Sequence, residues 1–94
     1  MKLNQNFITH ASKGEHYMIS TGNAEFKGIV KNNETASFII ECLKTETTEM
    51  EIVEKLLKKY TGTNIETIEK DVNCIIEKLR SIGALEEWIA YIKI

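Results

Sequence analysis

Short runs in which apolar and polar residues alternate fill the first third of the chain. Residues 6–12 and 16–20 alternate at the two-residue period of a half-buried strand, with Lys13-Gly14 between them. Because glycine adopts a positive φ without a steric penalty, this dipeptide predicts a tight hairpin turn. A third alternating run, residues 26–31, follows a turn at 21–23. The pattern predicts a three-stranded antiparallel sheet.

In the next part of the chain apolar residues recur at helical spacing. Amphipathic runs cover residues 34–43, 49–60 and 64–82, of which the last is the longest. Asn33 and Thr48 stand at the starts of the first two, where their side-chain oxygens can accept N–H groups that the first helical turn leaves unpaired. A small sheet followed by three helices predicts an α+β, winged-helix-like domain.

The third predicted helix carries a broad apolar stripe. Three isoleucines widen one flank of this stripe, and the same flank carries Asp71 and Lys78. On a helical wheel Cys74 falls almost opposite the stripe, so we expect its thiol to be more exposed than that of Cys42.

Composition indicates one modest domain. The chain has 94 residues and a formal net charge of −2, which gives no general attraction to phosphate. No apolar run reaches the roughly 20 residues of a membrane helix, and the N-terminus lacks the apolar stretch of a signal peptide. We therefore expect a cytoplasmic protein that does not engage a membrane.

The residues that could carry chemistry are isolated from one another. His10 and His16 lie on the two strands of one predicted hairpin and could approach each other, but no third ligand stands at a readable spacing. Cys42 and Cys74 have no close Cys or His neighbour, so free thiols are expected. The chain also lacks a glycine-rich phosphate loop. We predict no catalytic residue, no metal and no cofactor.

Two binding functions fit a winged-helix-like domain. In DNA recognition the third helix would enter the major groove, but its Lys70, Lys78 and Arg80 are outnumbered by acidic residues. In peptide capture, an unpaired sheet edge offers N–H and C=O groups to an added strand. Residues 26–31 fit the second function, since Gly28 lowers the steric cover over the backbone.

Several motifs, taken in order, resemble the PqqD family. The run Phe26-Lys27-Gly28-Ile29-Val30, followed by Asn33-Glu34-Thr35-Ala36, resembles the family's F-x-G-x-[apolar]-x-L-N-E-T-[small] centre. The Lys13-Gly14-Glu15 turn resembles its hairpin, and residues 79–85 resemble the end of its third helix. The resemblance covers about residues 6–86. Asn32 stands where the family usually has leucine, so we expect the corner between strand and helix to pack differently or to be more open.

The resemblance implies a non-catalytic recognition element for ribosomally synthesised peptides. Such a domain holds the leader region of a precursor peptide while a partner enzyme, often a radical SAM maturase, modifies the core region. In that family the leader adds to the edge of the third strand and lies against the third helix. Carried over, the contacting residues are Phe26, Lys27, Gly28, Ile29, Val30, Lys31, Asp71, Val72, Ile75, Lys78 and Leu79. Core packing is the alternative for Val72 and Leu79, and a solvated helix face is the alternative for Asp71 and Lys78.

The end of the chain extends beyond the family's usual limit. We expect a recognition domain over residues 1–87 and an extension over residues 88–94, which includes Trp88, Tyr91 and Ile92. The extension could add a strand, contact a partner enzyme, or mediate self-association into a homo-oligomer through these apolar side chains.

Overall fold

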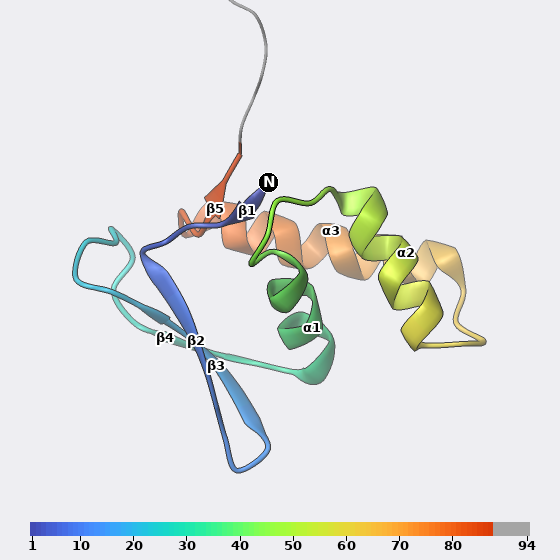
Figure 1. Cartoon of the computed structure of the whole chain (residues 1–94), viewed down its shortest axis with the longest axis horizontal. Helices are drawn as coiled ribbons and strands as arrows, with labels where there is room; N and C mark the ends of the chain where they lie inside the picture. Colours follow the sequence, from blue (N-terminus) through green and yellow to red (C-terminus); the bar gives the residue numbers. More distant parts are fainter. Residues whose placement is uncertain (88–94) are drawn as a thin grey trace, which may run out of the picture.

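The computed structural model of the protein describes residues 1–87. Its elements, in chain order, are β1 (Lys2–Leu3), β2 (Phe7–Ser12), β3 (Glu15–Ser20), β4 (Ile29–Asn32), α1 (Glu34–Cys42), α2 (Glu49–Lys59), α3 (Ile65–Ser81) and β5 (Leu85–Glu86). Strands β2, β3 and β4 form one antiparallel sheet in that order, and the three helices follow it (Figure 1). The predicted α+β, winged-helix-like architecture is confirmed.

The hairpin between β2 and β3 turns through two residues. Ser12 pairs with Glu15, and both residues between them have positive φ, 52° at Lys13 and 78° at Gly14. A turn of this kind matches the right-handed twist of the two strands that it joins. The hairpin predicted from the Lys13-Gly14 dipeptide is confirmed.

The third strand of this sheet begins later than the alternating pattern predicts. The pattern predicts a strand over 26–31, whereas β4 starts at Ile29 and ends at Asn32. Phe26 precedes the strand, and its ring stacks on that of Phe7 with the centroids 6.4 Å apart. Packing of this ring against the core decides the path of residues 26–28, so the predicted start of the strand was wrong.

The three helices begin and end within one residue of their predicted limits. Asn33 caps α1, because its side-chain oxygen accepts a hydrogen bond from the N–H of Ala36 at 2.7 Å. Thr48 caps α2 in the same way, with the N–H of Glu51 as donor at 3.2 Å. Cys42 on α1 is buried and Cys74 on α3 is exposed, as the helical wheel predicts.

One apolar core joins the inner face of the sheet to the three helices. The largest fully buried side chains are Met18, Ile39, Ile40, Leu43, Ile52, Leu56, Val72 and Ile76. They come from β3 and from all three helices, so the sheet and the helices are held in one arrangement. None of the helices described is long and apolar enough to cross a membrane.

A second, two-stranded sheet joins the beginning of the chain to its end. Lys2 pairs with Glu86 and Leu3 with Leu85. The N–H of Leu3 also donates to the carbonyl of Leu43, and the N–H of Asn4 to that of Ala84, each at 2.7 Å. The sequence pattern did not predict β1. The expected roles of residues 88–94 lie outside the described residues.

Candidate functional site

Strand β4 has an open edge. It pairs with β3 on one side, and no strand in residues 1–87 pairs with its other side. The N–H of Ser20 donates to the carbonyl of Gly28 at 3.1 Å. Because hydrogen-bonded pairs alternate along an antiparallel ladder, the backbone groups of Val30 and Asn32 also point toward β3. Those of Ile29 and Lys31 point outward and form the open edge.

Gly28 lies against its own sheet. Its N–H donates to Ser20 Oγ at 2.8 Å, and its carbonyl accepts from the N–H and the hydroxyl of the same serine. A Cβ at this position would meet the ring of Phe26 at 3.4 Å, which is ordinary van der Waals contact. The backbone of Gly28 therefore faces β3, and the open edge begins at Ile29, three residues after the predicted start of the strand.

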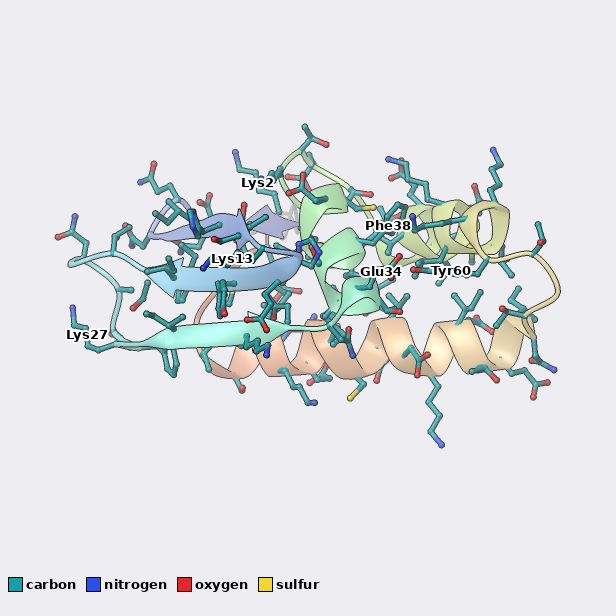
Figure 2. All side chains as sticks on the ribbon, turned by 90° about the horizontal axis from the view of Figure 1, so that it is seen from below. Lys2, Lys13, Lys27, Glu34, Phe38 and Tyr60 are labelled. Carbon is teal, nitrogen blue, oxygen red and sulfur yellow. The ribbon has the colours of Figure 1, made fainter. Side chains whose placement is uncertain are left out.

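A groove lies between β4 and the C-terminal half of α3. In Figure 2 the strand runs from near Lys27 toward Glu34 with α3 alongside it. The volume of the groove is about 280 Å³, and most of its lining is apolar. The residues that line this β4–α3 groove are Met18, Phe26, Val30, Asn32, Ala36, Ile40, Ile75, Lys78, Leu79, Ser81 and Ile82.

The structure brings most of the predicted contact residues to this edge and groove. Phe26, Val30, Ile75, Lys78 and Leu79 line the groove, although Leu79 is only 4% exposed because it also packs in the core, as its alternative interpretation expects. The side chains of the two edge residues point to the outer face of the sheet, where that of Ile29 is 66% exposed. The edge and the groove are thus adjacent, because Ile29 and Lys31 form the edge while Val30 and Asn32, which alternate with them along β4, line the groove.

Besides Gly28, three other predicted residues lie away from the edge and the groove. Val72 is fully buried and presents no surface to a ligand. It is therefore a core residue, which is the alternative interpretation given for it above. Asp71 lines a separate hollow together with Thr35 and Tyr60. Lys27 lies in the loop before β4, where its ammonium group donates to the carbonyl of Gly22 at 2.6 Å.

Sequence reasoning missed part of the groove. Its floor includes Ala36 and Ile40 of α1, and its lining includes Met18, Ser81 and Ile82. The spacing of four residues between Ala36 and Ile40 places them on one helical face, but only packing determines which element that face meets. Ile82 belongs to the flank of isoleucines that the sequence singled out.

The outer face of the sheet carries an ion pair beside the open edge. The ammonium group of Lys31 lies 3.1 Å from a carboxylate oxygen of Glu15, and the hydroxyl of Tyr17 donates to the same carboxylate. The hydrogen bond from Tyr17, followed by the interaction with Lys31, holds the pKa of Glu15 below its ordinary value. The charge of Lys31 is therefore engaged by Glu15 of the neighbouring β2–β3 hairpin.

A second ion-pair cluster lies at the C-terminal end of α3. Two nitrogens of Arg80 donate to the two carboxylate oxygens of Glu87 at 2.6 and 2.9 Å, and Arg80 also pairs with Glu77. These carboxylates, Glu87 first, raise the pKa of the guanidinium. The positive charge of Arg80 is thus compensated within the domain.

The two histidines lie on opposite faces of the hairpin. His10 pairs with Tyr17 and His16 pairs with Ala11, which are neighbouring positions of the ladder. Because successive side chains alternate across a sheet, the two imidazoles, which the sequence allowed to approach each other, point to opposite faces. Over residues 1–87, no cluster of three or more His, Cys, Asp or Glu side chains could hold a metal ion.

Comparison with known proteins identifies the family. The family model for coenzyme PQQ synthesis protein D, PqqD, matches residues 15–85. The chain belongs to the PqqD family. The match runs from β3 to the start of β5, so the PqqD part of the chain contains both the open edge and α3.

The PqqD fold is also found in a solved structure. The chain is similar to TbiB1, whose structure was determined in complex with the TbiA(beta) leader peptide. The TM-score is 0.78 and the sequences are 18% identical, with 95% of this chain and 99% of TbiB1 covered. No curated protein matches the chain. At this identity the likeness establishes a shared fold.

Proposed function

We propose that this protein binds, without catalysis, the leader region of a ribosomally synthesised precursor peptide. The leader adds as a strand to the open edge of β4 and places side chains in the β4–α3 groove. The adjacency of the two features carries the proposal, because Ile29 and Lys31 offer outward backbone groups directly above an apolar groove of about 280 Å³. Membership of the PqqD family and the leader-bound state of TbiB1 support it.

The two features have different tasks in this proposal. Backbone hydrogen bonds to the edge supply affinity for any extended segment, whereas the groove selects the side chains. An added strand points alternate side chains into the groove, where Val30, Ile75 and Leu79 offer apolar contact. Asp71 lies about one helical turn beyond Ile75, so only a longer leader would reach it.

Binding the leader also concentrates the core peptide. A disordered leader loses its conformational freedom once, on docking, and the tethered core then stays near a bound enzyme at an effective concentration on the order of millimolar. We propose a modifying enzyme as the second partner, of the radical SAM class that the family resemblance suggests.

DNA recognition is less well supported. In the part of α3 that would face a phosphate backbone, Arg80 is paired with Glu77 and Glu87. Lys70 and Lys78 are the other cations of α3, and acidic residues outnumber the basic ones along this helix. Tight binding to duplex DNA that weakens steeply with salt would overturn the peptide proposal.

The first experiment is an amide titration by NMR. The probe is a synthetic leader peptide from the precursor encoded next to the gene for this chain. We expect shifts at residues 29–32 and 75–82, which border the edge and the groove. Absence of shifts, or shifts confined to residues 88–94, would contradict the proposal.

A matched pair of variants tests the edge itself. Lys31→Pro removes an outward N–H, and proline is tolerated on sheet edges because no ladder hydrogen bond is lost there. Lys31→Ala removes the same side chain and keeps the N–H. We expect Lys31→Pro to weaken peptide binding roughly tenfold relative to Lys31→Ala, since a lost hydrogen bond of about 1.5 kcal/mol corresponds to that factor. Equal affinities would refute strand addition at Lys31.

A further inference from the structure

Two polar side chains stand in the otherwise apolar lining of the β4–α3 groove without a partner. The third polar residue, Ser81, is satisfied, since its hydroxyl donates to the carbonyl of Lys78 at 2.7 Å. Among the described residues the Asn32 carboxamide makes no side-chain hydrogen bond and Lys78 forms no ion pair. Both groups are available to a ligand in the groove.

The two groups come from facing walls of the groove. Asn32 follows Val30 by two residues, so both side chains lie on the inner side of β4. Lys78 lies on α3 between Ile75 and Ile82, on the flank that forms the opposite wall. A side chain that enters between strand and helix therefore meets the amide from one side and the ammonium group from the other.

The charge of Lys78 is not compensated by its neighbours on the same helix. Glu77 is engaged by Arg80, and Arg80 in turn is held by Glu87. The chain as a whole carries a formal charge of −2, so the surface has no general attraction for acidic peptides. A preference for negative charge at this point would arise from Lys78 alone.

We propose that the bound leader carries an aspartate or glutamate whose carboxylate accepts hydrogen bonds from Asn32 and Lys78. This inference rests on the proposed function and adds the side chain that the groove selects. An apolar side chain in the same place would leave two hydrogen-bond donors unpaired when the peptide excludes water. A carboxylate satisfies both, and charge-assisted hydrogen bonds are roughly twice as strong as neutral ones.

The strand geometry also fixes the neighbours of the acidic residue. The side chain two positions away on the side of Val30 points into the same groove, where Phe26 and Val30 present apolar surface. The selected leader pattern is therefore an acidic residue two positions from an apolar one. Asn32, which replaces the leucine usual in the PqqD family, supplies the amide of this site.

The test is a selection from a displayed library of random 12-residue peptides on the full chain. We expect the enriched peptides to share one Asp or Glu two positions from an apolar residue. Lys78→Glu should change that preference to Lys or Arg, and Asn32→Leu should shift it toward apolar residues. Lys70→Glu is the matched control, because it makes the same charge change at an exposed position of α3 outside the groove lining.

Synthetic versions of the enriched peptides give the magnitude. Replacing the acidic residue by leucine should weaken binding to the unmodified chain roughly tenfold or more, because a hydrogen bond to a charged group contributes about 1.5–3 kcal/mol. Peptides that require the edge N–H of Lys31 but show no acidic preference would overturn this inference alone. If no peptide is enriched, or if the enriched ones bind Lys31→Pro and Lys31→Ala equally, the proposed function fails with it.

Discussion

Phe26 shows how one side chain sets the start of the binding edge. Its ring is partly buried against the core and stacks on Phe7, which holds the chain away from strand geometry until Ile29. Gly28 lies beside this ring, where a Cβ would make van der Waals contact with it. Phe26, which the sequence pattern predicts as the first residue of a strand, therefore lines the groove instead.

Glu15 links the hairpin to the edge residue Lys31, and this link depends on pH. Because its pKa is lowered in the folded protein, the stabilisation is present above the unfolded pKa and is lost as the pH falls through the folded value. We expect NMR titration of the Glu15 carboxyl carbon to show a pKa below the ordinary value. Tyr17→Phe should raise this pKa, since the tyrosine hydrogen bond is the main cause of the shift.

Tyr60→Phe is the control for this titration, because it also removes a hydroxyl but one that makes no hydrogen bond to Glu15. If Tyr17→Phe left the pKa of Glu15 unchanged, the hydroxyl–carboxylate contact would not exist in solution.

At the scale of elements, α3 uses one apolar stripe for two purposes. Val72 and Ile76 point into the core and are fully buried, whereas Ile75 and Ile82 are partly buried along the groove. A helix that contacts only the core needs a narrower apolar face than the one α3 has. The broad stripe in the sequence of α3 reflects its contact with both the core and the groove. Of the three isoleucines that widen the stripe, Ile75 and Ile82 line the groove, whereas Ile68 is buried in the core.

The β2–β3 hairpin depends on a turn that only certain residues adopt easily. At Gly14, φ is +78° and a Cβ would meet nothing within 4 Å, so Gly14→Ala introduces backbone strain without a clash. We expect a loss of about 1–2 kcal/mol in the free energy of unfolding, measured by urea denaturation. Gly22→Ala is the control, because its site is equally open and its φ is not in the strained range. Equal unfolding midpoints for the two variants would contradict this account of the turn.

At the scale of the whole molecule, β1 and β5 close the domain. They join residues more than 80 positions apart and lie beside the ends of α1 and α3 (Figure 1). The pairing fixes the segment that follows α3, and with it the position of Glu87 against Arg80.

Neighbouring substitutions in β1 test this closure. Leu3 packs against the core, whereas Lys2 is exposed. We expect Leu3→Ser to lower the free energy of unfolding by about 1–2 kcal/mol through lost apolar burial, and Lys2→Ser to change it little. A shift of this size is a large part of the roughly 5–15 kcal/mol that stabilises a typical domain. Equal effects from the two variants would show that β1 contributes no packing.

Much of the fold could be predicted from the sequence because it depends on local patterns. The hairpin follows from Lys13-Gly14 between alternating runs, and the helix starts follow from the caps Asn33 and Thr48. Strand β1 was missed because two residues carry no readable period. The start of β4 was missed because Phe26 satisfies both a strand pattern and a place in the core.

The sequence by itself determined the order of the three-stranded sheet and the three helices, the positions of the hairpin turn and the helix caps, and the family, since each depends on residues close together in the chain. Only the tertiary structure decided that Ile29 and Lys31 present their backbone groups outward, because this depends on the register of β4 against β3. It also decided that Val72 faces the core while Ile75 faces β4. Asn32 and Lys78 line one groove because strand and helix pack over α1, a contact between residues far apart in the chain.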